Sequence, residues 1–468
     1  SKIFSEMTTI NQAYESIRQR HVDYMWQLMP EYVKRLSWSR TEIEAEQTRA
    51  LRSLLDHAKT HSPWHKERLA SINPSTATIA DLDKIPPMTK EDLMSNWDSI
   101  VTDKRACLKD ANTHLLNLKS DAYYLDEYHV ILSGGSSGVR GVFLYDWHGW
   151  TVSYISLVRG FNTILEKICS DNKAAIASIS AYVASHASSA LSQTFSSNLN
   201  EIAHIPVTLP IDEIVNELNH VRPALIHCFP NILSHLCAKF LDGKLKFTSK
   251  AIWCTSEPLL PGDREVTERT FKVPLVNTWS ASEVNGGSFP CINGGGFHIS
   301  EDVCIIEPVN SYGKRVERGE RADKIYMTNL FNNIMPLIRY EITDQFKVID
   351  GICPCGSSFL KVEDVFGRTD DQFVYEENII VHPLNYYSPL FQEPDIMEFL
   401  VHQTERGADI DVVVTGIPDF IRLESSIKSN LVQVGLKSPV VNICQVENIK
   451  RSKTGKLKRF IPLARNKK

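Results

Sequence analysis

The sequence predicts an α/β protein in which a large mixed-sheet part is followed by a small α+β module. Short apolar runs indicate buried strands, which we expect at 174–179, 224–228, 251–254 and 274–277. Amphipathic stretches that indicate helices alternate with these runs, at 210–221 and 232–240. Such alternation is typical of a parallel or mixed sheet with helices on its faces. In the last hundred residues, a strand expected at 409–415 and a helix expected at 420–434 indicate a separate module.

The length and composition are those of a globular protein with more than one domain. The 468 residues correspond to two or three domains of about 150 residues each. Hydrophobic residues make up 43% and charged residues 23% of the chain, and the net charge of -5 argues against a nucleic-acid partner. No apolar run approaches the ~20 residues of a membrane span, and the first residues do not resemble a signal peptide. We therefore expect a cytoplasmic protein with no membrane partner, and the ten scattered cysteines suit a reducing compartment.

Several local patterns predict the remaining elements in order. Residues 9–60 carry apolar side chains at helical spacing, which indicates peripheral helices in a region that extends to about residue 90. Thr89, with an acidic residue three positions later, can cap a helix, and Asp146 can cap another that runs to about residue 166. Farther along, the pattern turns to strands at 325–348 and then to a turn-rich junction at 351–368.

The chain is organised around a glycine- and serine-rich loop that follows the apolar run 130–132. Its six residues are Ser133, Gly134, Gly135, Ser136, Ser137 and Gly138. Glycines let the backbone approach a ligand closely, and successive N–H groups with serine hydroxyls can donate hydrogen bonds to phosphate oxygens. The loop matches neither the Walker loop nor the dinucleotide fingerprint GxGxxG. Taken alone, it favours a phosphate-binding loop no more than a surface turn.

Later segments supply what a nucleotide held by this loop would need. In 279–283, Trp279 offers a stacking face, Ser282 a hydroxyl for a phosphate, and Glu283 an oxygen ligand for magnesium. Asp344 can accept hydrogen bonds from both ribose hydroxyls. Each segment also has a plain structural interpretation, as the end of a strand.

Two further segments have both a functional and a plain interpretation. Residues 367–371 have the composition of a hinge, or of an exposed linker turn. The turn Thr454-Gly455-Lys456 can deliver a lysine to an anionic centre. It lies within residues 450–468, which contain nine basic residues and no acid, so a solvated basic tail is the alternative.

In order and spacing these segments resemble the adenylate-forming (ANL) superfamily of acyl-CoA synthetases, adenylation domains and luciferases. The chain looks most like the branch of phenylacetate-CoA ligases and capsule-biosynthesis adenylate-forming proteins, which residues 54–58 and 87–90 also resemble. The resemblance covers most of the chain. It implies an ATP- and acid-binding domain at 1–367, a hinge at Asp370, and a small mobile α+β domain at 368–468.

Carried over to the matching positions, the resemblance implies roles at the phosphates. Residues 133–138 would bind the β- and γ-phosphates of ATP, Ser282 would meet the α-phosphate, and Glu283 would hold Mg²⁺. Lys456 would bridge the substrate carboxylate and the α-phosphate during adenylation. A carboxylate that attacks a polyanion is repelled by its negative charge. Mg²⁺ and Lys456 would therefore neutralise the charge between the attacking and leaving oxygens.

The resemblance also implies a set of residues around the nucleoside. Asp344 and Arg368 would hold the ribose hydroxyls. The residues that would flank the adenine are Ser256, Glu257, Pro258 and Trp279.

The chain departs from the family's pattern at three places. Val139 stands where many members carry a lysine, so a phosphate contact is missing or comes from Arg140. Trp279-Ser280 replaces the more usual Tyr-Gly, which would crowd the adenine or the acyl pocket. After the hinge, Glu376-Glu377 places negative charge where CoA phosphates would approach, although Asn378 can still adopt the left-handed turn conformation. CoA as the acceptor is therefore left open.

A candidate metal site is formed by three cysteines and a histidine. Cys291 and His298 lie seven positions apart, and Cys353 and Cys355 are separated only by a proline. Structural zinc favours four such ligands in a closed tetrahedron built from two short segments. Cys-x-Cys is tighter than the common Cys-x-x-Cys, so unrelated buried cysteines and a structural Zn²⁺ site both stay open.

The resemblance implies an ATP-dependent, AMP-forming ligase that activates a carboxylic acid, with aromatic acids as one class, and transfers the acyl group to a thiol such as CoA. One alternative is transfer to an amine, another nitrogen nucleophile or a carrier-protein thiol, and a second is a nucleotide-binding protein that has lost catalysis. The oligomeric state is open, with a homodimer as one form. We expect the acid pocket near Tyr182, His227, Phe229, Trp279 and Asn285.

Overall fold

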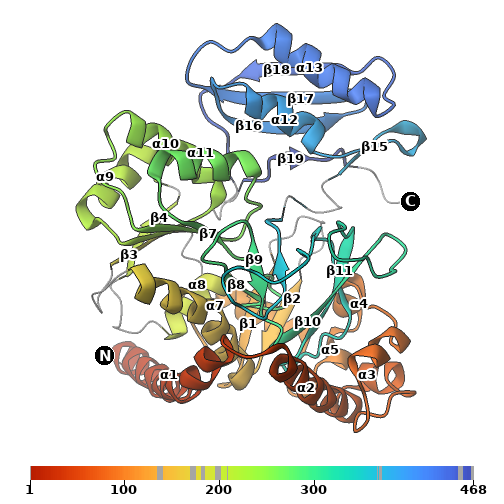
Figure 1. Ribbon diagram of the computed structural model, residues 1–468. Coiled ribbons are helices and arrows are strands. Elements are labelled where there is room, and N and C mark those ends of the chain that lie inside the picture. Colours follow the sequence, from red (N-terminus) through yellow and green to blue (C-terminus); the bar gives the residue numbers. More distant parts are fainter. Residues whose placement is uncertain are drawn as a thin grey trace.

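The computed structural model describes most of the chain. The described residues are 2–133, 141–168, 175–180, 185–195, 202–207, 209–365, 367, 372–451 and 457–464. The last hundred residues form a small module that lies over one end of the larger part (Figure 1).

A five-stranded sheet forms the centre of one half of the larger part, in the order β4-β3-β5-β6-β7. Its strands are β3 Ile176–Ser180, β4 Ile202–Pro206, β5 Leu225–Cys228, β6 Ala251–Cys254 and β7 Leu275–Asn277. All neighbouring pairs are parallel, so the carboxyl ends of the strands meet at one edge. The four predicted strands are confirmed. The edge strand β4 was not predicted, because its five residues are largely exposed and end in proline.

Helices cover both faces of this sheet. One face packs against α9 Ile211–Val221, α10 Leu233–Leu241 and α11 Pro261–Phe271, in a buried apolar cluster. The other face packs against α7 Trp147–Ile168, and α8 Ala187–Phe195 lies beside α7. The predicted helices at 210–221 and 232–240 are therefore confirmed.

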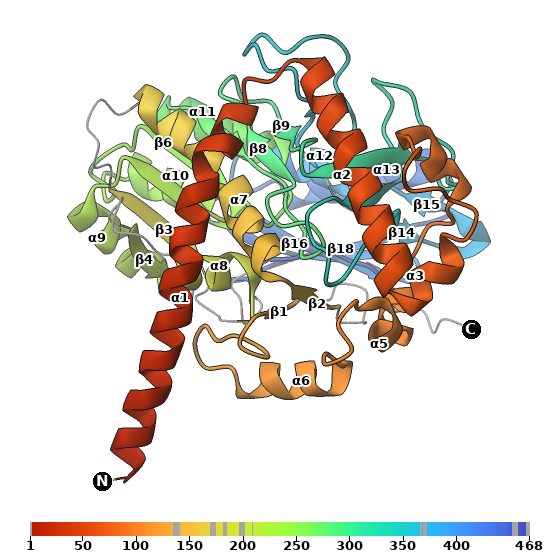
Figure 2. The same cartoon turned by 90° about the horizontal axis from the view of Figure 1, so that it is seen from below.

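The amino-terminal region is helical, as its periodicity predicted. Two long helices, α1 Lys2–Arg35 and α2 Arg40–His61, lie across the outside of the larger part (Figure 2). Shorter elements follow: α3 Pro63–Arg68, η1 Ile79–Lys84, α4 Lys90–Ser95, α5 Trp97–Ile100 and α6 Leu108–Asn117. Thr89 caps α4 in a capping box with Asp92, and the Asp146 carboxylate accepts a hydrogen bond from Gly149 N in the first turn of α7. Both predicted caps are confirmed.

Small antiparallel sheets complete the larger part. A hairpin of β1 His129–Leu132 and β2 Val142–Tyr145 flanks the glycine-rich loop. A second sheet contains β10 Cys304–Val309, β11 Lys324–Asn329 and β12 Tyr340–Ile342, and a third contains β8 Ser288–Pro290, β9 Phe297–Ile299 and β13 Lys361–Val362. The strands expected within 325–348 are present as β11 and β12.

The small module has a sheet of its own, in the order β18-β17-β16-β19. Its strands are β16 Ile396–Thr404, β17 Gly407–Val414, β18 Val440–Gln445 and β19 Phe460–Ile461, preceded by the short pair β14 Phe373–Val374 and β15 Ile380–Val381. The module also contains η4 Glu376–Asn378, α12 Leu384–Gln392 and α13 Phe420–Gln433, so the predicted strand and helix are confirmed. The boundary at 367 and 368 stays a prediction.

No helix in the described ranges is both long enough and apolar enough to cross a membrane.

Candidate nucleotide and acid site

One cavity of about 430 Å³ collects the motif residues at the carboxyl edge of the parallel sheet. The predicted site residues that line it are Ser133, Ser256, Glu257, Pro258, Trp279, Ser282, Glu283 and Asp344. They come from segments more than two hundred positions apart, which the fold brings to one place. The other predicted site residues, Gly134 to Gly138, Arg368, Asp370 and Lys456, lie outside the described residues, as do Val139 and Tyr182.

The base of the glycine-rich loop is closed by Ser133 and Gly141. Ser133 N donates to Gly141 O at 2.9 Å, and Gly141 N donates to Ser133 Oγ at 2.8 Å. Ser282 lies next to this base, with its Oγ 3.5 Å from Leu132 O, and its carbonyl accepts a hydrogen bond from the Tyr145 hydroxyl at 2.7 Å. A serine hydroxyl is therefore held directly beside the start of the loop.

Glu283 is 8% exposed, and its carbonyl accepts a hydrogen bond from Asn329 Nδ2 at 3.0 Å. Burial, reinforced by the charge of Glu283, raises the pKa of the Tyr340 hydroxyl well above its ordinary value, so that hydroxyl stays protonated. A buried carboxylate that lines a cavity is a fitting oxygen ligand for Mg²⁺.

Trp279 links two of the predicted motifs. Its Nε1 donates to Asp344 Oδ2 at 2.8 Å, and its ring meets Phe346 edge-on, with 5.0 Å between centroids. The tryptophan that replaces the family's tyrosine therefore fixes the carboxylate predicted to hold the ribose. Both side chains are buried and still line the cavity.

Glu257 connects the cavity to the small module. Its carboxylate accepts hydrogen bonds from Asn231 N at 3.1 Å, Asn231 Nδ2 at 2.7 Å and Leu457 N at 2.7 Å. Burial raises the pKa of this carboxyl, and the three N–H donors act in the opposite direction. The sequence indicated no such contact for Glu257.

Further polar and charged contacts join the module to the larger part. Arg459 lies 2.9 Å from Asp263, and His235 Nε2 lies 2.7 Å from Glu398 Oε2. Arg451 donates to Asn231 Oδ1 at 3.0 Å and also pairs with Glu398. These contacts hold one orientation of the module over the cavity.

Two cations that the motif analysis missed also line the cavity, Lys90 and Lys458. Lys90 is the first residue of α4, directly after the Thr89 cap, and its position in a capping pattern gave only a structural signal. Lys458 follows Lys456 by two positions and was overlooked among the basic residues of the tail.

The predicted acid pocket is only partly as expected. His227, Trp279 and Asn285 line the cavity. Phe229 instead packs into the apolar cluster between the sheet and helices α9 to α11, because it follows β5 on the side away from α7. At the predicted CoA loop, Glu377 and Asn378 both have left-handed backbone, with φ of 59° and 57°. The conformation expected for Asn378 is therefore confirmed.

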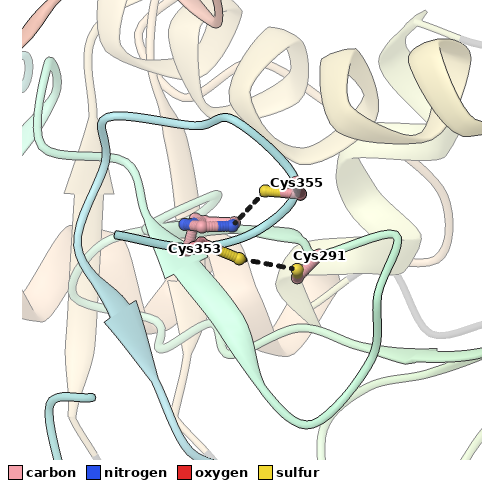
Figure 3. Close-up of side chains that lie close together, drawn as sticks. Cys291, Cys353 and Cys355 are labelled. Atoms are coloured by element: carbon pink, nitrogen blue, oxygen red, sulfur yellow. Dashed lines mark hydrogen bonds between the residues drawn. The ribbon is translucent and has the colours of Figure 1, made fainter. Parts of the chain in front are cut away.

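The predicted metal ligands lie together beside β9, apart from the cavity. Cys291 Sγ is 3.6 Å from Cys353 Sγ, and Cys355 Sγ is 3.2 Å from His298 Nε2 (Figure 3). All four ligand atoms lie within 4.8 Å of one another. Burial lowers the pKa of His298 to about 4, and its Nδ1 lies 3.0 Å from Phe359 O, which leaves Nε2 directed at the thiols.

This geometry fits a tetrahedral zinc ion. Two thiolates bound to one zinc lie about 3.8 Å apart, since each Zn–S bond is about 2.3 Å long. The four ligands leave no coordination position open for a substrate. The tight Gly294-Gly295-Gly296 turn beside the cluster is held by Lys361 Nζ, which donates to Gly294 O at 2.8 Å, and a Cβ on Gly296 would lie 2.0 Å from Val362 O.

Comparisons with known proteins agree with this architecture. No protein-family model matches the chain. Protein CapK of Staphylococcus aureus is 22% identical over 409 residues, which are 85% of this chain and 82% of CapK. Phenylacetate-coenzyme A ligase of Thermus thermophilus is 25% identical over 197 residues, which are 41% of this chain and 44% of that ligase.

Among solved structures, 2-hydroxyisobutyryl-CoA ligase is similar over 92% of this chain and 91% of its own. The postadenylation state of that ligase, in complex with R3-HIB-AMP, superposes with a TM-score of 0.71 at 17% identity. Its thioesterification state, in complex with 2-HIB-AMP and CoA, gives 0.59 at 18% identity. The chain has the fold of the adenylate-forming CoA ligases, and the resemblance that its motifs predicted is confirmed.

Proposed function

We propose that this protein is an ATP-dependent, AMP-forming ligase that activates a carboxylic acid as its acyl-adenylate and passes the acyl group to CoA. The observation that carries the proposal is the single cavity in which Ser133, Trp279, Ser282, Glu283 and Asp344 converge. The similarity to a phenylacetate-coenzyme A ligase supports the same activity.

In this proposal the chain's own residues position ATP and screen its charge. Asp344, whose carboxylate is held by the hydrogen bond from Trp279 Nε1, accepts hydrogen bonds from the ribose hydroxyls. Ser282 donates a hydrogen bond to the α-phosphate beside the loop. Glu283 would hold Mg²⁺, which neutralises negative charge between the attacking and leaving oxygens. Lys90 and Lys458 add positive charge to a cavity whose loop has Val139 in place of the family's lysine.

Lys456 is proposed as the residue that bridges the substrate carboxylate and the α-phosphate. Support comes from its sequence neighbours, because Leu457 and Lys458 line the cavity and Leu457 N is held by Glu257. The roles of Gly134 to Gly138 and Arg368, and the hinge at Asp370, are proposals that rest on the family resemblance. A cytoplasmic location and a homodimer also stay predictions.

The acceptor has one specific alternative. Glu376 and Glu377 lie on a solvent-exposed turn, and Glu377 Oε1 is 3.8 Å from Lys437 Nζ. An acidic turn is unfavourable for CoA phosphates, so an amine or a carrier-protein thiol is the second candidate acceptor.

We also propose that Cys291, His298, Cys353 and Cys355 hold a structural Zn²⁺. The support is the distance set of the four ligand atoms and the closed shell that they form. The ion would tie the segment that carries β9 to the junction before the small module.

The first experiment is acid-dependent exchange of labelled pyrophosphate into ATP, with magnesium and without CoA. We expect exchange with at least one acid from a panel of aromatic, aliphatic and amino acids. Addition of CoA, carrier protein or amines to the preformed adenylate then identifies the acceptor. Confirmed ATP binding without exchange for any acid would contradict the proposal and favour a nucleotide-binding protein that has lost catalysis.

A further inference from the structure

A row of hydrogen-bonded polar side chains lies on the face of the parallel sheet that packs against α7. Ser178 of β3 and His227 of β5 are register partners, and Ser178 Oγ is 2.9 Å from His227 Nδ1. His227 Nε2 is in turn 2.8 Å from Thr255 Oγ1, just after β6. Ser178 also lies 3.2 Å from Ser180, its neighbour on the same face. All four side chains line the cavity, so we call them the polar row.

The imidazole in the polar row is neutral. Burial, together with the positive field of His204, lowers the pKa of His227 to about 4. A neutral imidazole donates from one nitrogen and accepts at the other, so the hydroxyls of Ser178 and Thr255 have opposite roles toward it. Each hydroxyl keeps further hydrogen-bonding capacity. The polar row can therefore both donate to a ligand and accept from it, without a charged group.

The opposite wall of the cavity is apolar. It is formed by Tyr154, Leu157, Val158 and Phe161 on successive turns of α7. The lining continues past them to Trp26 and Met29 of α1. An acid in this space would lie with an apolar body against α7 and a polar edge toward the sheet.

A second polar group lines the cavity independently of the polar row. Asn285 is 2% exposed, and no acceptor for its Nδ2 is found among the described residues. Its neighbour Gly286 packs against Ser156 and Leu157, which places the segment beside the apolar wall. A buried donor without a partner is unfavourable, so a ligand that supplies an oxygen here would bind more tightly.

We propose that the acid activated by this protein carries at least one hydroxyl on an apolar body, and that Asn285 and the polar row recognise that hydroxyl. This inference rests on the proposed function, which it deepens by naming the substrate class. Asn285 Nδ2 donates to the hydroxyl oxygen, or Ser178 and His227 exchange hydrogen bonds with the hydroxyl. An acid without the hydroxyl leaves the Asn285 donor buried and unpaired.

The test uses matched pairs of acyl-sulfamoyl adenosines, which mimic the acyl-adenylate and bind without turnover. The pairs are phenylacetic acid with its 2-, 3- and 4-hydroxy derivatives, and hexanoic acid with its 3- and 6-hydroxy derivatives. Calorimetry gives the Kd of each, and pyrophosphate exchange gives kcat/KM for each parent acid. We expect the best hydroxylated member of a pair to bind about 10- to 100-fold more tightly than its unsubstituted parent.

Variants then assign the preference to residues. Asn285→Leu and Ser178→Ala should each reduce the preference for the hydroxylated member to less than about threefold in the scaffold that uses that side chain. His227→Gln keeps one donor and one acceptor and should retain most of the preference. The matched control is Leu157→Val on the apolar wall, which should weaken both members of a pair alike. Thermal unfolding shows that each variant is folded.

Two results overturn the inference and leave the proposed function intact. One is equal or weaker binding of every hydroxylated member while exchange proceeds, and the other is a preference that both variants leave unchanged. If no acyl-sulfamoyl adenosine binds and no acid supports exchange, the proposed function fails and this inference fails with it.

Discussion

The Cys₃His cluster and the cavity lie close together in the sequence and differ in how their polar atoms are satisfied. Cys291 and His298 follow Glu283 by fewer than sixteen positions. In the cluster, four ligand atoms face one another within 4.8 Å. In the residues that line the cavity, Asn285 Nδ2 and Asn277 Oδ1 are buried without partners among the described residues.

This difference separates a structural site from a chemical one. A closed set of soft ligands can bind one ion and then has no remaining position for a substrate. A cavity whose buried polar atoms lack partners has free energy to gain from a ligand. We therefore expect changes in the cluster to affect stability, and changes in the cavity to affect catalysis.

The largest effect is expected from removal of zinc. Cys353→Ser, or prolonged chelation, should lower the free energy of unfolding by roughly 5 kcal/mol, because ligand binding is part of the folding free energy of such sites. The melting temperature should fall by about 5–10 °C. Calorimetry and metal analysis measure both quantities. Cys444→Ser, at an exposed free cysteine, is the control and should change neither.

The contrast between the cluster and the cavity would be wrong if loss of the metal changed the reaction and not the stability. Protein purified with zinc in the buffer should contain about one zinc per chain. A metal-free protein with unchanged melting temperature would contradict the structural role. Loss of pyrophosphate exchange in chelated protein that is still folded would show that the ion takes part in the reaction.

The second prediction concerns Lys456, whose substitution should lower the rate of the reaction and leave the stability nearly unchanged. Lys456→Ala should lower the rate of acyl-adenylate formation about 10²- to 10³-fold. The variant loses the positive charge that would stabilise the negative charge developing in the transition state. We expect the melting temperature to stay within about 1 °C of the wild type. Single-turnover formation of the adenylate is the measurement. Lys437→Ala, at an exposed lysine of the same module, is the matched control.

Most of the secondary structure could be predicted because its signals are local. The apolar runs at β3, β5, β6 and β7 and the caps at Thr89 and Asp146 depend on residues within a few positions of one another. The Cys₃His cluster could also be anticipated, because ligand chemistry restricts which residue types come together. The edge strand β4 lacked such a signal.

The site was harder to predict because it depends on contacts between distant segments. Glu257 and Leu457 are two hundred positions apart, and their hydrogen bond follows from the orientation of the small module. The bond from Trp279 Nε1 to Asp344 was equally unforeseen, although both residues were singled out. Motifs identified which residues belong to the cavity, and only the fold showed which of them contact each other.

The third prediction tests whether Glu257 belongs to catalysis or only to packing. Glu257→Gln should lower the rate of adenylation about tenfold, because a neutral amide accepts more weakly than a carboxylate from the N–H groups of Asn231 and Leu457. The Kd for ATP should change less than about threefold. Equilibrium binding and single-turnover kinetics separate the two effects. A larger change in Kd than in rate would show that Glu257 contacts the nucleotide instead.

The smallest effect expected is a pH dependence of stability from the buried histidine of the cavity. The pKa of His227 is lowered from 6.5 to about 4 by burial and by His204, and those of His21 and His65 are lowered to about 3, also chiefly by burial. Below about pH 6.5 the unfolded chain takes up protons that the folded chain does not, so stability is lost as the pH falls from 6.5 towards 4. Each such histidine contributes at most about 1.4 kcal/mol per pH unit.

His227→Gln keeps the hydrogen bonds of the polar row and removes this titration. In urea unfolding at pH 7.5 and pH 5, the variant should lose about 1–2 kcal/mol less stability than the wild type. If His227→Gln shows the same acid sensitivity as the wild type, the imidazole is already protonated at pH 5. That result would contradict a lowering of the His227 pKa by burial.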